Sequence, residues 1–459
     1  MTRILDRTGR PGPDSTTHPS ILRMAAPLVV SFWMRSLFTF VDTVYAAYLG
    51  DSAVAAIGFS IPLDFLLIAC WVGVSTGLTS CLSRAMGARE GARIEQLLSV
   101  GRRITWSLVP LFSVLAAAVY LGADHLGLEP HTARLFAIYS GVLIGGSAFT
   151  AFWSIMPDSI IKAHHDTRST MWAGIWSNVI NLVLNTVFTF VFGWGVFGIA
   201  LSTVLGRFGG LIYALRVAAR HEAARKASGL DDAPTLDPQP FRSIMALAIP
   251  AALSFSLMAV ESSLVNWLLT DRPHATSSIA AYGIFYRVML FALMPIIAAS
   301  VAILPFVARR FGEGDLRAVR RGLREVVLIG AAYCVLVMTP ALGLSAGVIA
   351  QFLAESQVTA DLTRVALWLC PLACLAMIPF QLLRPAFEGL QRGWPGLAMA
   401  ILRYAVLAPP AAWLGRTIAI EIGVPVLHGI IVGLICASTL SSVIFIAWMA
   451  RVLGRLEAR

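Results

Sequence analysis

The sequence predicts an all-α polytopic membrane protein with about twelve transmembrane helices in two pseudo-symmetric six-helix bundles around a central cavity. Three observations predict this fold class: an apolar composition, a regular succession of apolar stretches, and an internal repeat. Hydrophobic residues make up 58% of the 459 residues, charged residues only 13%, and the mean hydropathy is +0.77. Because a soluble domain carries about 25% charged residues, this chain needs lipid around its apolar surface.

An apolar helix needs about 20 residues to cross about 30 Å of hydrocarbon. Stretches of that kind lie near residues 22–49, 54–83, 104–121, 135–161, 172–192, 197–217, 244–269, 278–307, 326–346, 365–383, 397–414 and 423–452. Lysine and arginine concentrate in alternate loops, on the side of both termini. We therefore predict a multi-pass protein of the cell inner (plasma) membrane with both termini cytoplasmic. The net charge of +10 arises from these short clusters, so no nucleic-acid partner is predicted.

The chain divides into two lobes. Residues 1–20 are polar, lack the apolar core of a signal peptide and are expected to form a disordered cytoplasmic tail. The lobes are predicted at 21–219 and 243–459, joined by a charged, proline-containing cytoplasmic linker at 220–242.

The two lobes repeat one another. Residues 25–28 (AAPL) open the first lobe and 248–251 (AIPA) the second, and the basic, glycine-containing segments 84–91 and 309–315 occupy matching places. Each half has an even number of spans, so the copies share one orientation and a substrate cavity would lie between them. This arrangement favours transport over a static scaffold.

Catalytic and cofactor signals are weak. No P-loop occurs, and the one G-x-G-x-x-G match, at residues 193–198, lies between apolar spans without a preceding strand. The six cysteines show no zinc or disulfide spacing. We predict no enzyme, no cofactor and no metal site, but a monomer that acts on a small-molecule substrate among membrane lipids.

Four segments carry a family resemblance: residues 40–50 (FVDTVYAAYLG), 161–168 (IKAHHDTR), 177–185 (SNVINLVLN) and 280–287 (AAYGIFYR). Together they resemble the multidrug and toxic compound extrusion (MATE) family, and the last resembles its DinF-like branch. The resemblance implies two six-helix bundles, a V-shaped cavity, and export driven by inward H⁺ or Na⁺.

A cation-coupling site is expected in the outer half of the first lobe. Asp42, Asn185 and Thr203 should lie at similar depth, and Asn181 shares a helix face with Asn185. One carboxylate with neutral amides and a hydroxyl predicts a site for a proton or a small hard cation. The resemblance implies the same role for Asp42, Asn181 and Thr203, but family members commonly carry aspartate where this chain has Asn185. The missing carboxylate favours H⁺ over Na⁺, because Na⁺ prefers a cluster of ionised oxygens.

Asp42 is the expected proton carrier. Burial in an apolar bundle favours the neutral form of a carboxyl group, and protonation from outside would loosen its polar contacts to the fifth and sixth helices. Pro27 removes a backbone hydrogen bond and is the expected hinge of the first helix. A purely structural hydrogen bond of Asp42 is the alternative.

Other charged residues also lie within spans, where each is costly. Glu261 and Arg287 should lie at similar depth on adjacent antiparallel helices, which predicts a polar pair of the second lobe, structural rather than coupling. Arg35 would act on Asp42 or pair with Asp64, and the sequence leaves both possibilities open.

Two further arginines, Arg207 and Arg403, fall in the cytoplasmic halves of their predicted spans. Their side chains are expected to snorkel to the membrane surface.

The leading hypothesis is a secondary-active antiporter that exports small amphiphilic drugs or metabolites, with cations favoured, in exchange for H⁺ by protonation of Asp42 and alternating access. The alternative is a flippase for a lipid-linked precursor of the same superfamily. A pyrophosphate lipid would need cavity arginines or lysines, which this sequence seldom places at membrane depth.

Overall fold

A computed structural model describes residues 20–126, 128–229, 235–270, 275–354 and 356–458, without the side chains of residues 37–43, 47, 51 and 259. The expected disordered tail at 1–20 therefore lies, apart from Ser20, outside the described residues, as does the side chain of Asp42. The described chain is helical, with no strand.

The first lobe contains α1 (Ile21–Leu49), α2 (Asp51–Gly87), α3 (Gly91–Gly122), α4 (Pro130–Ala163), α5 (Thr167–Thr186) and α6 (Gly195–Ser228). A 3-10 turn, η1 (Ala123–His125), extends α3, and a π-helical segment, η2 (Val187–Val191), extends α5.

The second lobe contains α7 (Pro240–Leu269), α8 (Ala275–Gly312), α9 (Leu316–Tyr333), α10 (Thr339–Leu353), α11 (Gln357–Gly389), α12 (Gly393–Ile401), α13 (Ala408–Glu421) and α14 (Val426–Glu457). The π-helical segments η3 (Cys334–Met338) and η4 (Leu402–Leu407) join α9 to α10 and α12 to α13 into two continuous rods.

Eleven helical rods of the described chain are long and apolar enough to cross a membrane. The 29-residue helix α1, part of which lies outside the described side chains, is the remaining rod. The expected all-α fold of about twelve spans is confirmed. The linker is shorter than expected, because α6 continues to Ser228 through an Ala-, Arg- and Lys-containing stretch of high helix propensity.

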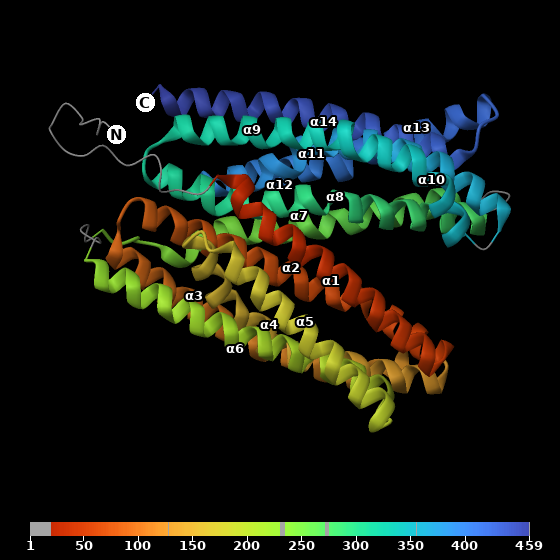
Figure 1. Cartoon of the computed structure of the whole chain (residues 1–459), viewed down its shortest axis with the longest axis horizontal. Helices are drawn as coiled ribbons and strands as arrows, with labels where there is room; N and C mark the ends of the chain where they lie inside the picture. Colours follow the sequence, from red (N-terminus) through yellow and green to blue (C-terminus); the bar gives the residue numbers. More distant parts are fainter. Residues whose placement is uncertain (1–19, 127, 230–234, 271–274, 355, 459) are drawn as a thin grey trace.

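The two lobes lie one above the other in Figure 1, with α1–α6 below and α7–α14 above. Their helices approach each other at the left of the view, where α14 ends, and diverge toward the right.

The first helix of each lobe packs partly on the other lobe. Ile21 and Met24 at the start of α1 belong to the buried cluster of the second lobe. Ile244 and Leu247 at the start of α7 belong to the cluster formed by α2, α3, α4 and α6. Because each helix is buried in both lobes, a movement between the lobes must change the packing of α1 and α7.

Close backbone contacts join the lobes where they approach. A side chain at Gly87 would collide with the Arg309 carbonyl, and one at Gly312 would collide with the Arg84 carbonyl, so the ends of α2 and α8 touch through paired glycines. Nearby, the Ser80 hydroxyl donates a hydrogen bond of 2.7 Å to the Glu388 carbonyl.

Two aromatic contacts cross between the lobes closer to the middle of the helices. Trp33 of α1 stacks on Phe291 of α8, with ring centroids 5.9 Å apart, and Phe65 of α2 lies 6.2 Å from Phe255 of α7.

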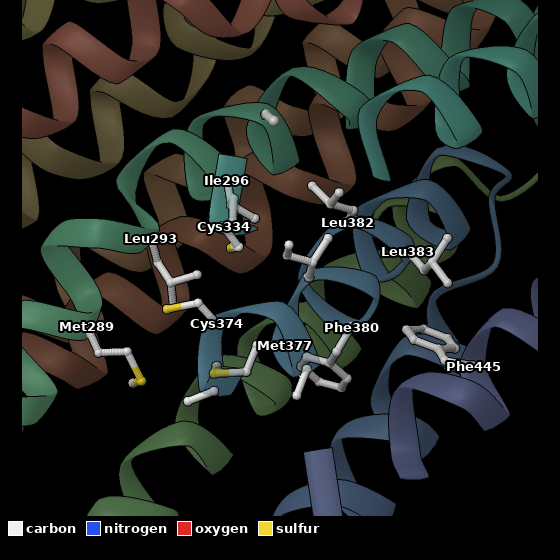
Figure 2. Packing of buried hydrophobic residues seen from close by; sticks show 14 of the residues in the cluster. Met289, Leu293, Ile296, Cys334, Cys374, Met377, Phe380, Leu382, Leu383 and Phe445 are labelled. Atoms are coloured by element: carbon white, nitrogen blue, oxygen red, sulfur yellow. The ribbon is translucent and has the colours of Figure 1, made fainter. Parts of the chain in front are cut away.

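The core of the second lobe is formed largely by α8 and α11. Figure 2 shows Met289 and Leu293 of α8 beside Cys374, Met377 and Phe380 of α11. These apolar side chains border the polar groups described below.

Candidate functional site: polar residues within the two lobes

The first lobe has a buried polar contact between α5 and α6. The Asn181 amide nitrogen donates hydrogen bonds to the hydroxyls of Ser202 (3.3 Å) and Thr203 (3.2 Å). Gly206 permits this approach, since a Cβ there would lie 2.6 Å from the Ser177 carbonyl. The structure thus brings Asn181 and Thr203 together, as the sequence predicted.

Asn185 lies one turn further along α5 and is fully buried. Its side-chain oxygen accepts a hydrogen bond of 3.2 Å from the Thr189 hydroxyl in η2. Asn181 and Asn185 thus form one polar stripe on α5.

Asp42 lies on α1, but its side chain is outside the described residues. Tyr45, one turn further along α1, has its hydroxyl 2.6 Å from that of Thr186, the neighbour of Asn185. This turn of α1 therefore lies against the polar end of α5. The role of Asp42 itself stays a prediction.

A second group of charges lies between α1, α2, α4 and α6. Asp64 of α2 interacts electrostatically with both Arg207 and Arg35. Arg207 also donates a hydrogen bond to the Ser147 hydroxyl of α4. Arg35 is thus close enough to Asp64 for an electrostatic interaction, and its action on Asp42 stays a prediction.

The expected snorkelling of Arg207 is wrong. Its guanidinium donates a hydrogen bond to the Ser147 hydroxyl within the bundle. This bond and the electrostatic interaction with Asp64 offset its loss of hydration.

Pro27 lies inside α1 and is half-buried. The helix continues on both sides of it, so the role of Pro27 as a hinge remains a prediction.

The second lobe contains an ion pair between the partly buried Glu261 of α7 and the buried Arg403 of η4, with Oε2 and Nη2 3.6 Å apart. Arg403 is only 2% exposed. Its guanidinium lies 5.0 Å from the ring centroid of Phe380 and 4.6 Å from that of Tyr404, and Nη1 donates a hydrogen bond of 3.2 Å to the Tyr404 hydroxyl.

The expected Glu261–Arg287 pair does not form among the described side chains: Glu261 pairs with Arg403, and Arg287 is exposed. The physical reason is the packing of α7, which contacts α12 more extensively than its neighbour in sequence, α8. The expected snorkelling of Arg403 is wrong for the same reason, since its rod presents it to α7.

A small pocket, open at its mouth, adjoins this ion pair. Most of its surface is apolar or aromatic. The polar groups that line it, besides the ion pair, are Tyr282, Tyr286, Gln381, Tyr404 and Ser438. Sequence reasoning found Glu261 but missed the pocket.

These features define a class: a multi-pass α-helical membrane transporter of two repeated lobes, with polar groups buried in each lobe. Residues 27–187 and 250–414 match the MatE family model. The chain therefore belongs to the multidrug and toxic compound extrusion (MATE) family of multidrug efflux transporters.

Similar proteins cover almost the whole chain. The probable multidrug resistance protein YoeA of Bacillus subtilis is 23% identical over 422 residues, 88% of this chain and 89% of that protein. The probable multidrug resistance protein NorM of Bradyrhizobium diazoefficiens is 24% identical over 85% of both chains. An outward-facing structure of a multidrug resistance MATE transporter covers 96% of both chains, with a TM-score of 0.81 and 20% identity, and so shares the fold.

Proposed function

We propose that this transporter is a secondary-active antiporter of the inner (plasma) membrane that exports small amphiphilic cations in exchange for H⁺. One observation carries the proposal. Asn181 hydrogen-bonds Thr203, Asn185 lies one turn further along α5, and none of the three can ionise. The next residue, Thr186, contacts Tyr45 in the turn of α1 that follows Asp42. A proton needs only one carboxylate, whereas Na⁺ is held by several oxygen ligands, best with more than one of them ionised.

Asp42 couples the two fluxes by competition. Protonation of Asp42 removes a negative charge, which weakens the binding of a cationic substrate, and deprotonation restores it. A ligand shifts a conformational equilibrium only by its differential affinity for the two states.

The helix α1 transmits this change to the lobes. Its first turns are buried in the second lobe, while Tyr45 near its other end contacts α5. A bend at Pro27 between these regions would alter the contact between the lobes. In the proposed topology, with both termini cytoplasmic, the end where the lobes meet faces the cytoplasm and the lobes diverge toward the outside (Figure 1).

The charges at membrane depth favour an exporter over a flippase for a pyrophosphate lipid. Arg35 and Arg207 both interact with Asp64. Arg384 lies 3.5 Å from Glu388, and Arg403 is paired with Glu261. These arginines already face carboxylates, so they are poorly placed to receive a second anionic group.

We expect Asp42→Asn to reduce efflux of rhodamine 123 by at least about tenfold, which corresponds to about 1.4 kcal/mol. The measurement is efflux from proteoliposomes under an imposed pH gradient at constant Na⁺. Asp361→Asn is the matched control, since Asp361 is an exposed residue of α11. Full proton-driven efflux by Asp42→Asn would refute the role of Asp42, and a requirement for Na⁺ at fixed pH gradient would refute the choice of H⁺.

A further inference from the structure

The carboxylate in the pocket of the second lobe already has a positive charge beside it. We propose that Arg403 is the resident counter-cation of Glu261, so that this lobe binds no coupling ion and the transporter is coupled through the first lobe alone. The second half of this statement rests on the proposed function, which assigns the coupling ion to Asp42.

Arg403 is buried among contacts that hold its side chain. It is 2% exposed, lies 5.0 Å from the ring centroid of Phe380 and 4.6 Å from that of Tyr404, and donates a hydrogen bond to the Tyr404 hydroxyl. A guanidinium stays protonated at any pH the protein meets. The positive charge that a bound cation would bring is therefore a fixed part of the chain.

This charge opposes the binding of a second ion at Glu261. A proton on Glu261 would leave the guanidinium buried without its carboxylate, which is strongly unfavourable. The Nε of Arg403 already makes no hydrogen bond to any described atom, so the residue depends on Glu261 for compensation. A metal cation would have to enter beside the guanidinium and would be repelled by it.

The remaining groups around the pair do not supply an equivalent charge. Tyr282 and Tyr286 face Glu261 from α8 and are neutral at physiological pH. Gln381 of α11 and Ser438 of α14 are uncharged. The next arginine, Arg384 of α11, lies 3.5 Å from the Glu388 carboxylate. Among the described residues, Arg403 is thus the charge that sets the state of Glu261.

The first lobe has no such cation at the matching place. His165 and Gln391 occupy equivalent loop positions of the repeat, each with a positive φ (62° and 61°) directly after α4 and α11. Arg403 follows Gln391 at the same distance along the chain as Ser177 of α5 follows His165, so Ser177 is the equivalent residue of the first lobe, and it is uncharged. The charge beside Glu261 is therefore specific to the second lobe at this position of the repeat, and it opposes ion exchange there.

Infrared titration of the purified full chain in lipid tests this proposal without a substrate. We expect wild type and Glu261→Gln/Arg403→Met to show the same protonated-carboxyl absorption from about pH 5 to about pH 9. Arg403→Met alone should gain one protonated carboxyl in this range, because the variant removes the positive charge that opposes a proton on the Glu261 carboxylate. Arg403→Lys, which keeps the charge, and Arg364→Met, which removes an exposed arginine, should both behave as wild type.

Two results would overturn the proposal. One is a titrating carboxyl in wild type that the double variant lacks, and this comparison stands even if Arg403→Met does not fold. The other is a folded Arg403→Met that gains no protonated carboxyl. Asp42→Asn separates this proposal from the proposed function. If a protonated-carboxyl absorption of wild type is lost in Asp42→Asn, that absorption belongs to the first lobe and does not bear on Glu261.

Discussion

At the scale of single residues, a substitution at Asn185 tests the proposed coupling to H⁺ rather than Na⁺. It is fully buried one turn from Asn181 and accepts a hydrogen bond from Thr189. We expect Asn185→Asp to add Na⁺ stimulation of efflux, by about tenfold or less, because a second carboxylate gives a hard cation another ionised oxygen ligand. Efflux at fixed pH gradient over a Na⁺ series measures the effect.

The matched control is Asn266→Asp, which adds a carboxylate to α7 of the other lobe. An equal response of both variants to Na⁺, or none in Asn185→Asp while H⁺-driven efflux persists, would contradict the assignment of Asn185 to the ion site.

Regular helices made part of the site predictable at this scale. Counting residues from the ends of the spans predicts Asn185 and Thr203 at similar depth, and the helical repeat puts Asn181 on the same face as Asn185. Both steps need regular helices, and α5 is unbroken from Thr167 to Thr186 while α6 runs regularly through Thr203. The same count did not predict the partner of Glu261. Arg287 was expected from its depth, but the partner is Arg403, which lies on a rod distant in sequence. Depth follows from local sequence, whereas the neighbour of a helix face depends on packing of the whole lobe.

At the scale of elements, the start of α5 is stabilised by Asp166. Its carboxylate accepts hydrogen bonds from the Ser169 amide (3.1 Å) and hydroxyl (2.6 Å), and its Oδ2 lies 2.9 Å from His221 Nε2 on α6. The hydrogen bond from His221 is the main reason why the pKa of Asp166 falls to about 2. Asp166 therefore both caps α5 and joins it to α6.

We expect Asp166→Ala to destabilise the protein by about 1 kcal/mol at neutral pH, the usual effect of losing an N-cap. Asp166→Asn should lose less, because asparagine also caps helices. Because the pKa of Asp166 is lower in the folded protein than its unfolded value of about 4, ionised Asp166 stabilises the fold above that pH. The greater stability of wild type over Asp166→Asn should therefore disappear as the pH falls from about 4 to about 2. Thermal unfolding in detergent at several pH values tests this. Equal stability of all three proteins at neutral pH would show that the cap contributes nothing.

The π-helical segments explain what could not be predicted among the elements. η4 lies in the middle of a rod whose composition resembles that of any apolar span, and no residue pattern predicts a π-helical segment there. The wider π turn shifts the faces of the helix that follow it, and such turns are frequent at functional sites. The predicted rod began at residue 397 rather than Gly393, so Arg403 was placed too close to the membrane surface.

At the scale of the whole molecule, the number of spans and the repeat were predictable from composition and spacing, but the sharing of α1 and α7 between the lobes was not. Ile21 and Ile244 look like ordinary apolar residues at the start of a span, and only the fold shows that each is buried in the opposite lobe. Their burial makes the lobes separable only if α1 and α7 repack.

The paired glycines at the ends of α2 and α8 give a test of lobe closure. A side chain at Gly312 would meet the Arg84 carbonyl and, at 3.0 Å, the Ala88 nitrogen, so Gly312→Val should force these ends apart. Cys81 lies beside this contact, 2% exposed, with its sulfur 3.6 Å from the Gln391 side chain of the other lobe. In Gly312→Val we expect maleimide to label Cys81 about tenfold faster or more, as measured by mass spectrometry. A tenfold change corresponds to a loss of about 1.4 kcal/mol in the free energy that favours the closed contact.

Efflux should fall in the same variant, because an exporter that cannot close this end leaks its substrate back. Gly454→Val is the matched control, since the space around Gly454 near the end of α14 is open. It should label and transport as wild type. Unchanged labelling of Cys81 in a folded Gly312→Val protein would mean that the glycine contact does not hold the lobes together, and that closure depends instead on the more central aromatic contacts, such as Trp33 on Phe291.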